Sequence, residues 1–380
     1  MFGKIFSSAG SIGSCPKETG TPKDRKSSLR QKIHREAFIR AAAAAAGICC
    51  LLTGILLSGP GIRAQAQNSA GQIVIVLDPG HGGVTEEDLG AQYAPYSEKQ
   101  LTLALAQAVK AELEQYDNVA VYLTRTTDTP VSLADRVNYA AALKADFFYS
   151  IHFNASSGHE FYGSEVLIPS KGTYYQQGYS FGMTQLTELQ ALGLYPRGLK
   201  TKIGNNGDYY GILRRATAAG IPSVIVEHCY LDHGVDRSFL SGSTSLEMLA
   251  HADAKAIAEY FHLSSAKLSA DYSGYTRVQV QAPAGAVYQD TTPPEHCSLQ
   301  LLSRSSSAAA VRITAQDTQS PVIYYSYSSD GGKSWSVLLP FDRSRTIWDV
   351  SIPLTAGTKS LKIRVYNLYE LYTESEAITF

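Results

Sequence analysis

The sequence has 380 residues, 44% of them apolar, so it is long enough for two globular domains of ordinary size. Its net charge of −1 hides an asymmetry: residues 1–66 carry ten basic and three acidic side chains, which leaves 23 basic and 31 acidic ones for residues 67–380. An acidic remainder lacks the phosphate-neutralising surface that nucleic-acid binding needs, so we exclude nucleic acid as a partner.

An uncharged apolar stretch, Ala41–Gly59, follows the basic N-terminal residues, and Ala64–Ala66 then forms an A-x-A site of the kind that signal peptidases cleave. About nineteen apolar residues also suffice to span a bilayer, so both a cleaved signal peptide and a retained anchor fit. Either way, the basic flank keeps the N-terminus in the cytoplasm and sends the remainder across the membrane. We therefore expect residues 1–66 to be a cytoplasmic basic tail plus signal or anchor, and the only membrane contact.

Residues 72–263 alternate apolar strands with amphipathic helices. The apolar run Ile73–Leu77 predicts a buried strand, and the capping-box spacing of Ser97 and Gln100 predicts a helix that begins at Glu98. Further along, the pattern predicts a strand over 119–124, a helix over 133–143, and strands over 147–152 and 224–227. This alternation predicts an α/β domain with a mixed, partly parallel sheet flanked by helices.

The composition and the hydrophobic periodicity of the sequence change after residue 263. Residues 264–292 are rich in Ser, Ala and Tyr and lack periodicity, so we expect a linker. Residues 293–380 contain short alternating runs without helical stretches, which predicts a small all-β, sandwich-like accessory domain. Within it, Ser328–Trp335 resembles an Asp-box hairpin, which is a folding motif, and the many tyrosines leave open a face that binds glycan or peptide. Cys229 and Cys297 fall in different predicted domains, so we expect both to be free thiols.

Two histidines fall where predicted strands end. His81 lies in the glycine-rich loop directly after the first strand, and His152 closes the third. We expect both at the sheet edge where α/β enzymes keep their sites. Glu98 taken alone is explained by the helix dipole, since a carboxylate is favoured at the first turn. Catalytic zinc, however, takes imidazole nitrogens and carboxylate oxygens from three protein ligands, and His81, Glu98 and His152 supply that set.

Glu227 ends an apolar strand, where a carboxylate is costly unless it has a partner or a task. We predict that it is the general base, which takes a proton from water while the metal polarises a carbonyl. His228 and His233 are rival metal ligands. A side chain next to Glu227 in the strand nevertheless faces the opposite way, which argues against His228.

The segments around these residues resemble the zinc-dependent N-acetylmuramoyl-L-alanine amidases, often called type 3 amidases. The resemblance covers residues 72–263. It runs through Ile75–Gly83, Glu98-Lys99, Leu123–Arg125 with Asp128, Leu133–Arg136, Ala145-Asp146, Ser150–Ala155 and Val226-Glu227.

The resemblance implies one zinc ion on His81, Glu98 and His152, with Glu227 as the catalytic glutamate. It also implies a peptidoglycan hydrolase that cuts the amide between the lactyl group of N-acetylmuramic acid and the L-alanine of the stem peptide. Export to the cell wall or extracytoplasmic space fits that substrate. Asn154 is expected to support a zinc ligand or to contact substrate.

The sequence departs from the family after Glu227, where Cys229 and His233 replace the usual residues. Arg125, Asp128 and Arg136 are interpreted as ion pairs that pin loops, since none belongs to the usual zinc ligand set. Two alternative functions remain. One is a catalytically inactive wall-binding or regulatory protein, and the other is a zinc peptidase that acts within the stem peptide.

Overall fold

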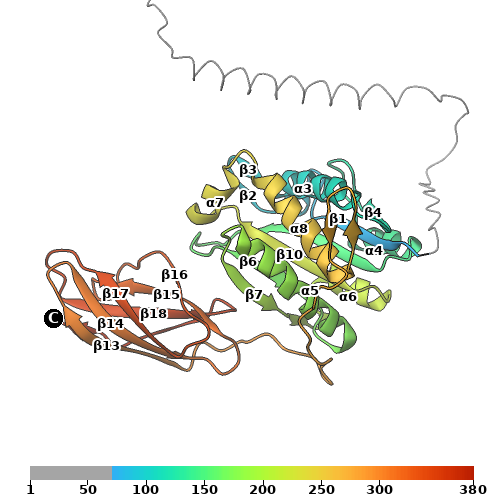
Figure 1. Ribbon diagram of the computed structural model, residues 1–380. Helices are drawn as coiled ribbons and strands as arrows, with labels where there is room; N and C mark the ends of the chain where they lie inside the picture. Colours follow the sequence, from blue (N-terminus) through green and yellow to red (C-terminus); the bar gives the residue numbers. More distant parts are fainter. Residues whose placement is uncertain (1–70) are drawn as a thin grey trace, which may run out of the picture. The chain divides into compact units, whose positions relative to one another are not determined.

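The computed structural model describes residues 71–380, so the predicted targeting segment lies outside the described residues. Its central feature is a six-stranded sheet of order β4-β1-β5-β10-β6-β7 (Figure 1). Neighbouring strands run parallel except for β10 and β6, which are antiparallel. The strands are β1 (Ile73–Pro79), β4 (Val119–Leu123), β5 (Phe147–Asn154), β6 (Ser164–Leu167), β7 (Pro196–Lys200) and β10 (Ser223–Tyr230). The predicted mixed, partly parallel sheet is confirmed.

Helices cover both faces of this sheet. They are α3 (Glu98–Leu113), α4 (Leu133–Ala142), α5 (Gly172–Ala191), α6 (Gly211–Ala218) and α8 (Ser245–Phe261). Successive side chains of β1 point to opposite faces. Ile75 and Leu77 join a core with α3, α5 and α8, whereas Val74 and Val76 join one with α4 and α6. Burial on both faces explains why β1 is a continuous apolar run instead of an alternating one.

Short elements complete this part of the chain. They are α2 (Glu86–Leu89), β2 (Gln92–Tyr93), β3 (Tyr96–Ser97), β8 (Ile203–Gly204), β9 (Gly207–Asp208), α7 (Gly234–Leu240), β11 (Ser264–Ser265) and β12 (Ala270–Asp271). Helix α3 begins at Glu98 as predicted, but the capping box does not form, because Ser97 makes no side-chain cap hydrogen bond. Ser97 instead ends the β2–β3 hairpin, and Glu98 N donates to Ala91 O at 2.9 Å. The hairpin therefore sets the start of α3.

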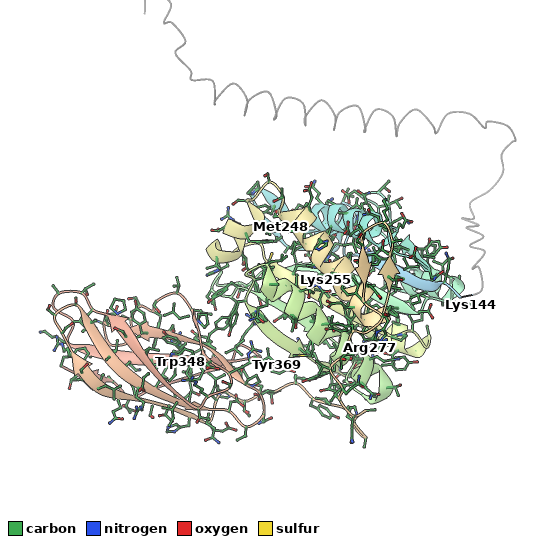
Figure 2. All side chains as sticks on the ribbon, viewed as in Figure 1. Lys144, Met248, Lys255, Arg277, Trp348 and Tyr369 are labelled. Atoms are coloured by element: carbon green, nitrogen blue, oxygen red, sulfur yellow. The ribbon has the colours of Figure 1, made fainter. Side chains whose placement is uncertain are left out.

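The segment over residues 264–292 runs along the helices that cover the sheet. Gln176 and Ser180 of α5 donate side-chain hydrogen bonds to the carbonyls of Val280 and Val278 at 2.7 and 2.8 Å. The guanidinium of Arg277, a residue labelled in Figure 2, lies over the Tyr260 ring of α8, 4.4 Å from the ring centroid. This segment is thus attached to the sheet domain along its length.

The C-terminal strands form two antiparallel sheets of orders β13-β14-β17 and β16-β15-β18-β19, with β20 paired to β18. The strands are β13 (His296–Arg304), β14 (Ala308–Gln316), β15 (Val322–Ser328), β16 (Leu339–Pro340), β17 (Ile347–Pro353), β18 (Ser360–Asn367), β19 (Tyr372–Glu374) and β20 (Ile378–Thr379). Val311 and Ile313 from β14 pack with Ile363 and Val365 from β18 in one apolar core. The sandwich-like, all-β prediction is confirmed, and β13–β20 are called the β-sandwich region below.

The predicted Asp-box turn is also present. Asp330 Oδ1 accepts hydrogen bonds from the backbone N–H groups of Lys333 and Ser334 at 2.9 and 3.0 Å, and Gly331 and Gly332 adopt φ of 80° and 91°. The motif closes a turn on its own backbone, as a folding motif should.

Apolar side chains also join the sheet domain to the β-sandwich region. Phe161, Tyr162 and Tyr230 form a buried cluster with residues of β15 and β18 such as Tyr324 and Tyr366. Cys229 and Cys297 are free thiols, as expected. No helix within residues 71–380 is long and apolar enough to cross a membrane.

Candidate active site

The loop that follows β1 brings His81 to the end of β5. Gly80 N donates to Ile151 O at 3.0 Å, which holds the loop against β5. A Cβ atom on Gly80 would lie 2.4 Å from His152 Cε1, so the close approach of the loop to the His152 ring requires glycine. His81 has φ of 61°, a left-handed conformation that costs of the order of 1–3 kcal/mol and persists only where surrounding contacts impose it.

Those contacts centre on buried Asp78. Arg136 Nη1 donates to Asp78 Oδ1 at 2.7 Å, and Arg136 Nη2 donates to the carbonyl of His81 at 2.7 Å. Burial opposes ionisation of Asp78, but the Arg136 guanidinium and three hydrogen bonds outweigh it and lower the pKa of this carboxyl. Arg136 therefore pins the backbone of His81 through its carbonyl and does not bond to its imidazole.

Arg125 and Asp128 hold the remainder of the same loop. Arg125 Nη2 donates to the carbonyls of Gly80 and Lys99, both at 2.8 Å. Asp128 accepts hydrogen bonds from Lys99 Nζ at 2.7 Å and from Gly83 N at 2.9 Å. Asp128 and Arg136 thus form the predicted ion pairs, with Lys99 and Asp78, whereas Arg125 holds the loop through neutral oxygen acceptors instead of an ion pair.

Glu98 lies between the two histidines. Its Oε1 is 3.0 Å from His152 Nδ1, and its Oε2 is 3.3 Å from His81 Nε2. Phe153 N and Ala91 N donate to the same two oxygens at 3.1 and 2.6 Å. Burial disfavours the charge on Glu98, but the hydrogen bonds to both histidines dominate and lower its pKa. The helix start places this carboxylate at the site, and the histidines explain its burial.

His81, Glu98 and His152 converge on one point. One donor atom from each lies within 4.8 Å of the others, and the two rings are edge-to-face with centroids 5.1 Å apart. Within residues 71–380 they are the only such group of three or more metal-ligating side chains. Zinc bonds of about 2.0–2.2 Å in a tetrahedral arrangement place donors roughly 3.4 Å apart, a spacing within the 4.8 Å limit that these three donor atoms meet. Two imidazoles and one carboxylate fit a catalytic zinc ion.

Glu227 lies one strand from this group. On β10 it pairs in register with His152 of β5 on one side and with Glu165 of β6 on the other. Its Oε2 is buried, and no hydrogen bond to the carboxylate is found within residues 71–380. Burial, with the nearby charges of Glu98 and Glu165, raises the pKa of Glu227 well above its usual range. A half-buried carboxyl with no protein partner has a strong need for a water or ligand.

The two rival histidines lie elsewhere. His228 is fully buried on the opposite side of β10, where Nδ1 is 3.0 Å from the His152 carbonyl oxygen and Nε2 is 2.9 Å from Asp253 Oδ2 on α8. His233 caps the N-terminus of α7, and its ring stacks on Tyr162 with centroids 4.8 Å apart. Neither histidine belongs to the group of three. Strand alternation turns His228 away from it, and His233 lies at the N-terminus of α7.

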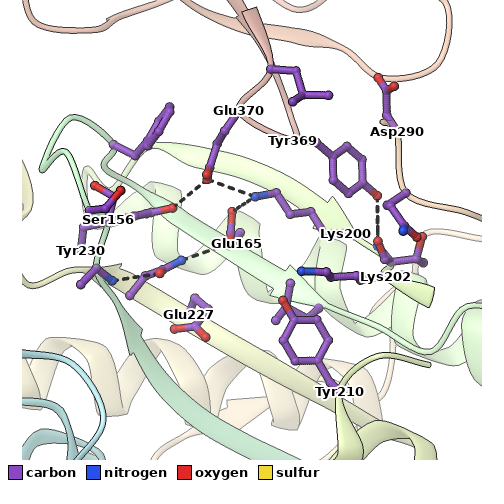
Figure 3. Close-up of a pocket in the computed structure, with 18 of the residues that line it drawn as sticks. Ser156, Glu165, Lys200, Lys202, Tyr210, Glu227, Tyr230, Asp290, Tyr369 and Glu370 are labelled. Atoms are coloured by element: carbon purple, nitrogen blue, oxygen red, sulfur yellow. Dashed lines mark hydrogen bonds and ion pairs between the residues drawn. The ribbon is translucent and has the colours of Figure 1, made fainter. Parts of the chain in front are cut away.

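Glu227 opens onto a cavity of about 670 Å³ (Figure 3). Asn154 lines it and donates Nδ2 to Glu165 Oε1 at 3.2 Å, so Asn154 sits beside the predicted base without touching its carboxylate. The structure adds residues that the sequence had not indicated: Glu165, Lys200, Lys202, Tyr210, Asp290 and Glu370. Tyr230 and Tyr369 line the cavity as well, and Tyr369 is one of the tyrosines that left open a face for glycan or peptide. Tyr210 also lines a second hollow that contains His81 and His152, so it borders both.

Most of these residues carried no local sequence signal. Glu165 sits in a four-residue strand, and Tyr369 and Glu370 come from the β-sandwich region, about 140 residues beyond Glu227. Arg197 is charged and fully buried, which distinguishes it from ordinary surface arginines. Its burial is seen only in the folded structure, so the sequence alone could not indicate it.

Known relatives match the sheet domain. The family model described as N-acetylmuramoyl-L-alanine amidase matches residues 75–259 and so ends before β13. The chain is 34% identical over 196 residues to N-acetylmuramoyl-L-alanine amidase CwlM of Bacillus licheniformis, with 50% of this chain and 70% of that protein covered. It is 33% identical over 214 residues to the sporulation-specific N-acetylmuramoyl-L-alanine amidase of Bacillus subtilis, with 55% and 75% covered.

Among solved structures, the catalytic domain of CwlV, an N-acetylmuramoyl-L-alanine amidase of Bacillus (Paenibacillus) polymyxa, aligns with TM-score 0.43 at 30% identity and covers 50% of this chain and 98% of that chain. The sequence relatives decide the assignment, because the first is more than 30% identical over more than two thirds of its own length. The chain therefore belongs to the N-acetylmuramoyl-L-alanine amidase family of hydrolases.

Proposed function

We propose that this protein hydrolyses peptidoglycan at the amide bond between the lactyl group of N-acetylmuramic acid and the L-alanine of the stem peptide. One zinc ion would be held by His81, Glu98 and His152, and Glu227 would act as the general base. The relatives carry the name of this activity. The observation that carries the residue assignment is the unpartnered carboxylate of Glu227 next in register to the convergent donor set.

The donor set fits zinc by its chemistry as well as its spacing. Zinc bound there would supply a Lewis acid for the scissile carbonyl and would lower the pKa of water. The chain's part is to hold the three side chains in place. Arg136 fixes the backbone of His81, and the Ala91 and Phe153 N–H groups fix the carboxylate of Glu98. Because His81 and Glu98 are both held in place before substrate binds, the ligand side chains need little reorganisation at the moment of reaction.

Glu227 performs the proton transfers. As water oxygen attacks the carbonyl carbon, Glu227 takes one proton from that water. It then gives that proton to the L-alanine nitrogen, so that the C–N bond breaks and a free amine and a lactyl carboxylic acid are formed. The acid passes the second proton of the attacking water to the amine or to solvent and becomes a carboxylate. The raised pKa of Glu227 suits the second step, because a carboxyl that holds its proton readily is a competent acid. The positive charge of Lys200 opposes the rise in the pKa of Glu227 and so favours the ionised carboxylate that the first step needs.

We further propose that residues 72–263 are the catalytic domain, 264–292 the connecting segment and 293–380 an accessory domain. Residues 1–66 would carry a cytoplasmic tail with a signal peptide or anchor, so that catalysis takes place outside the cytoplasmic membrane. The peptidoglycan substrate is found there.

Digestion of purified cell walls by the full chain tests this proposal, with mass spectrometry of the released products. We expect intact stem peptides with a free L-alanine amine, together with glycan whose muramic acid carries a free lactyl carboxylate. Addition of a zinc chelator should stop their release, and added Zn²⁺ should restore it.

Other products would contradict the proposal. Shortened stem peptides would identify a peptidase that acts within the peptide. A protein that binds walls and releases nothing, with zinc present, would be a catalytically inactive wall-binding or regulatory protein.

A further inference from the structure

A loop of the β-sandwich region, residues 368–371 between β18 and β19, reaches the cavity beside Glu227. Within it, Glu370 Oε1 accepts hydrogen bonds from Tyr230 Oη at 3.2 Å and from Lys200 Nζ at 3.4 Å (Figure 3). The same oxygen also accepts a hydrogen bond from Arg197 Nη2. Arg197 is fully buried and also donates Nε to Glu165 at 2.7 Å. The loop therefore supplies the second carboxylate of a buried ionic network in the catalytic sheet.

This loop is built to hold its shape. The buried Asn367 side chain accepts hydrogen bonds from the N–H groups of Tyr369 and Leu371, each at 3.0 Å, and donates to Asp290 at 2.9 Å. Tyr369 Oη donates to the carbonyl of Thr201 at 3.1 Å. Because the contacts come from both domains, Tyr369 and Glu370 form a fixed wall of the cavity.

Two charged groups on this side of the cavity retain free bonding capacity. All three donors to Glu370 use Oε1, and no hydrogen bond to its Oε2 is found among residues 71–380; about a third of the side chain (34%) is exposed. Lys202 is exposed and lies over the Tyr209 ring, 4.1 Å from its centroid, and it has no ion pair in the described part of the chain. The wall thus offers one acceptor and one cation to whatever enters beside Glu227.

We propose that this wall, Tyr369 and Glu370 of the β-sandwich region with Lys202 of the sheet domain, is the binding site for the stem peptide. Glu370 Oε2 accepts a hydrogen bond from a backbone amide of the peptide, and Lys202 pairs with one of its free carboxylates. The inference rests on the proposed function, because it takes a peptide attached to muramic acid as the ligand. It means that the catalytic groove is complete only with the β-sandwich region in place.

The test compares two soluble substrates on the full chain with zinc bound: N-acetylmuramoyl-L-alanine, and N-acetylmuramoyl tetrapeptide. Glu370→Gln keeps an acceptor for the network but turns the free acceptor into a donor. Lys202→Gln removes the cation. Each should raise KM for the tetrapeptide by about three- to fivefold, in line with single exposed ion pairs and hydrogen bonds, without changing kcat. KM for N-acetylmuramoyl-L-alanine should not change.

Matched controls are Glu376→Gln and Lys267→Gln, which change exposed side chains outside the cavity and should leave both substrates unaffected. Equal KM increases for both substrates, or a lowered melting temperature with unchanged KM, would mean that Glu370 only joins the domains and would overturn the proposal. Higher kcat in Glu370→Gln would also overturn it, by showing that the loop obstructs the groove. An inactive wild-type protein would instead refute the proposed function itself.

Discussion

The most local prediction concerns Gly80. An added Cβ in Gly80→Ala would lie 2.4 Å from His152 Cε1, 2.6 Å from Nε2 and 2.7 Å from Nδ1. Ordinary contacts between such atoms begin near 3.4 Å. The His152 ring must therefore move by about 1 Å, because the loop backbone is tied to Ile151 of β5 and cannot retreat.

The size of the effect follows from that displacement. Loss of the groups that orient a metal ligand typically weakens metal binding by about 10- to 100-fold, and a misplacement of about 1 Å at a reacting centre costs about 100-fold in rate. We expect Gly80→Ala to bind zinc about 10- to 100-fold more weakly and to lose about 100-fold in kcat/KM at saturating zinc. The free energy of unfolding should change less than the free energies of zinc binding and catalysis. The His152 ring lies at the edge of the core and can rotate toward the groove.

Competition with a chromogenic chelator measures the zinc Kd, and circular dichroism measures the melting temperature. Gly285→Ala is the matched control, since an added Cβ at Gly285 meets nothing within 4 Å. If Gly80→Ala bound zinc with the wild-type Kd and kept full activity, His152 would not be a ligand held by this loop.

Other predictions concern stability. Asp253→Asn removes the acidic partner of fully buried His228 and should cost about 3 kcal/mol in urea unfolding, whereas Asp349→Asn, which breaks an exposed pair, should have no measurable effect. Burial raises the pKa of Asp236 from 3.8 to about 6, so the native state binds more protons than the unfolded state between these values. Stability should therefore contain a contribution that falls as pH rises from 3.8 to about 6, and Asp236→Asn should abolish that part of the pH dependence of ΔG of unfolding. An unchanged slope in the variant would contradict this.

Strand ends and helix starts made the donor set predictable. His81 and His152 follow apolar runs, and parallel strands bring the carboxyl ends of such runs to one sheet edge. The helix at Glu98 was also found, although its predicted capping box was wrong. The β2–β3 hairpin sets that helix start, and two-residue strands leave no periodic pattern.

The rest of the groove depends on packing between distant segments. The connecting segment, residues 264–292, looked structureless because its contacts to α5 use backbone carbonyls, which composition does not reveal. Glu370 stood out by nothing in the sequence, and its role follows from its hydrogen bond with Arg197, about 170 residues earlier in the chain. Long-range ionic contacts of this kind leave no mark in the local sequence.

Glu227→Gln tests the central claim most directly, because it should separate metal binding from turnover. The variant keeps the shape of the side chain but cannot take a proton from water. We expect it to hold one zinc ion per chain by elemental analysis, with the wild-type Kd, and to release stem peptides from purified walls at least 1,000-fold more slowly, on the order of the loss expected for a general base. Release at the wild-type rate by a zinc-loaded variant would show that Glu227 is not the base and would contradict the account.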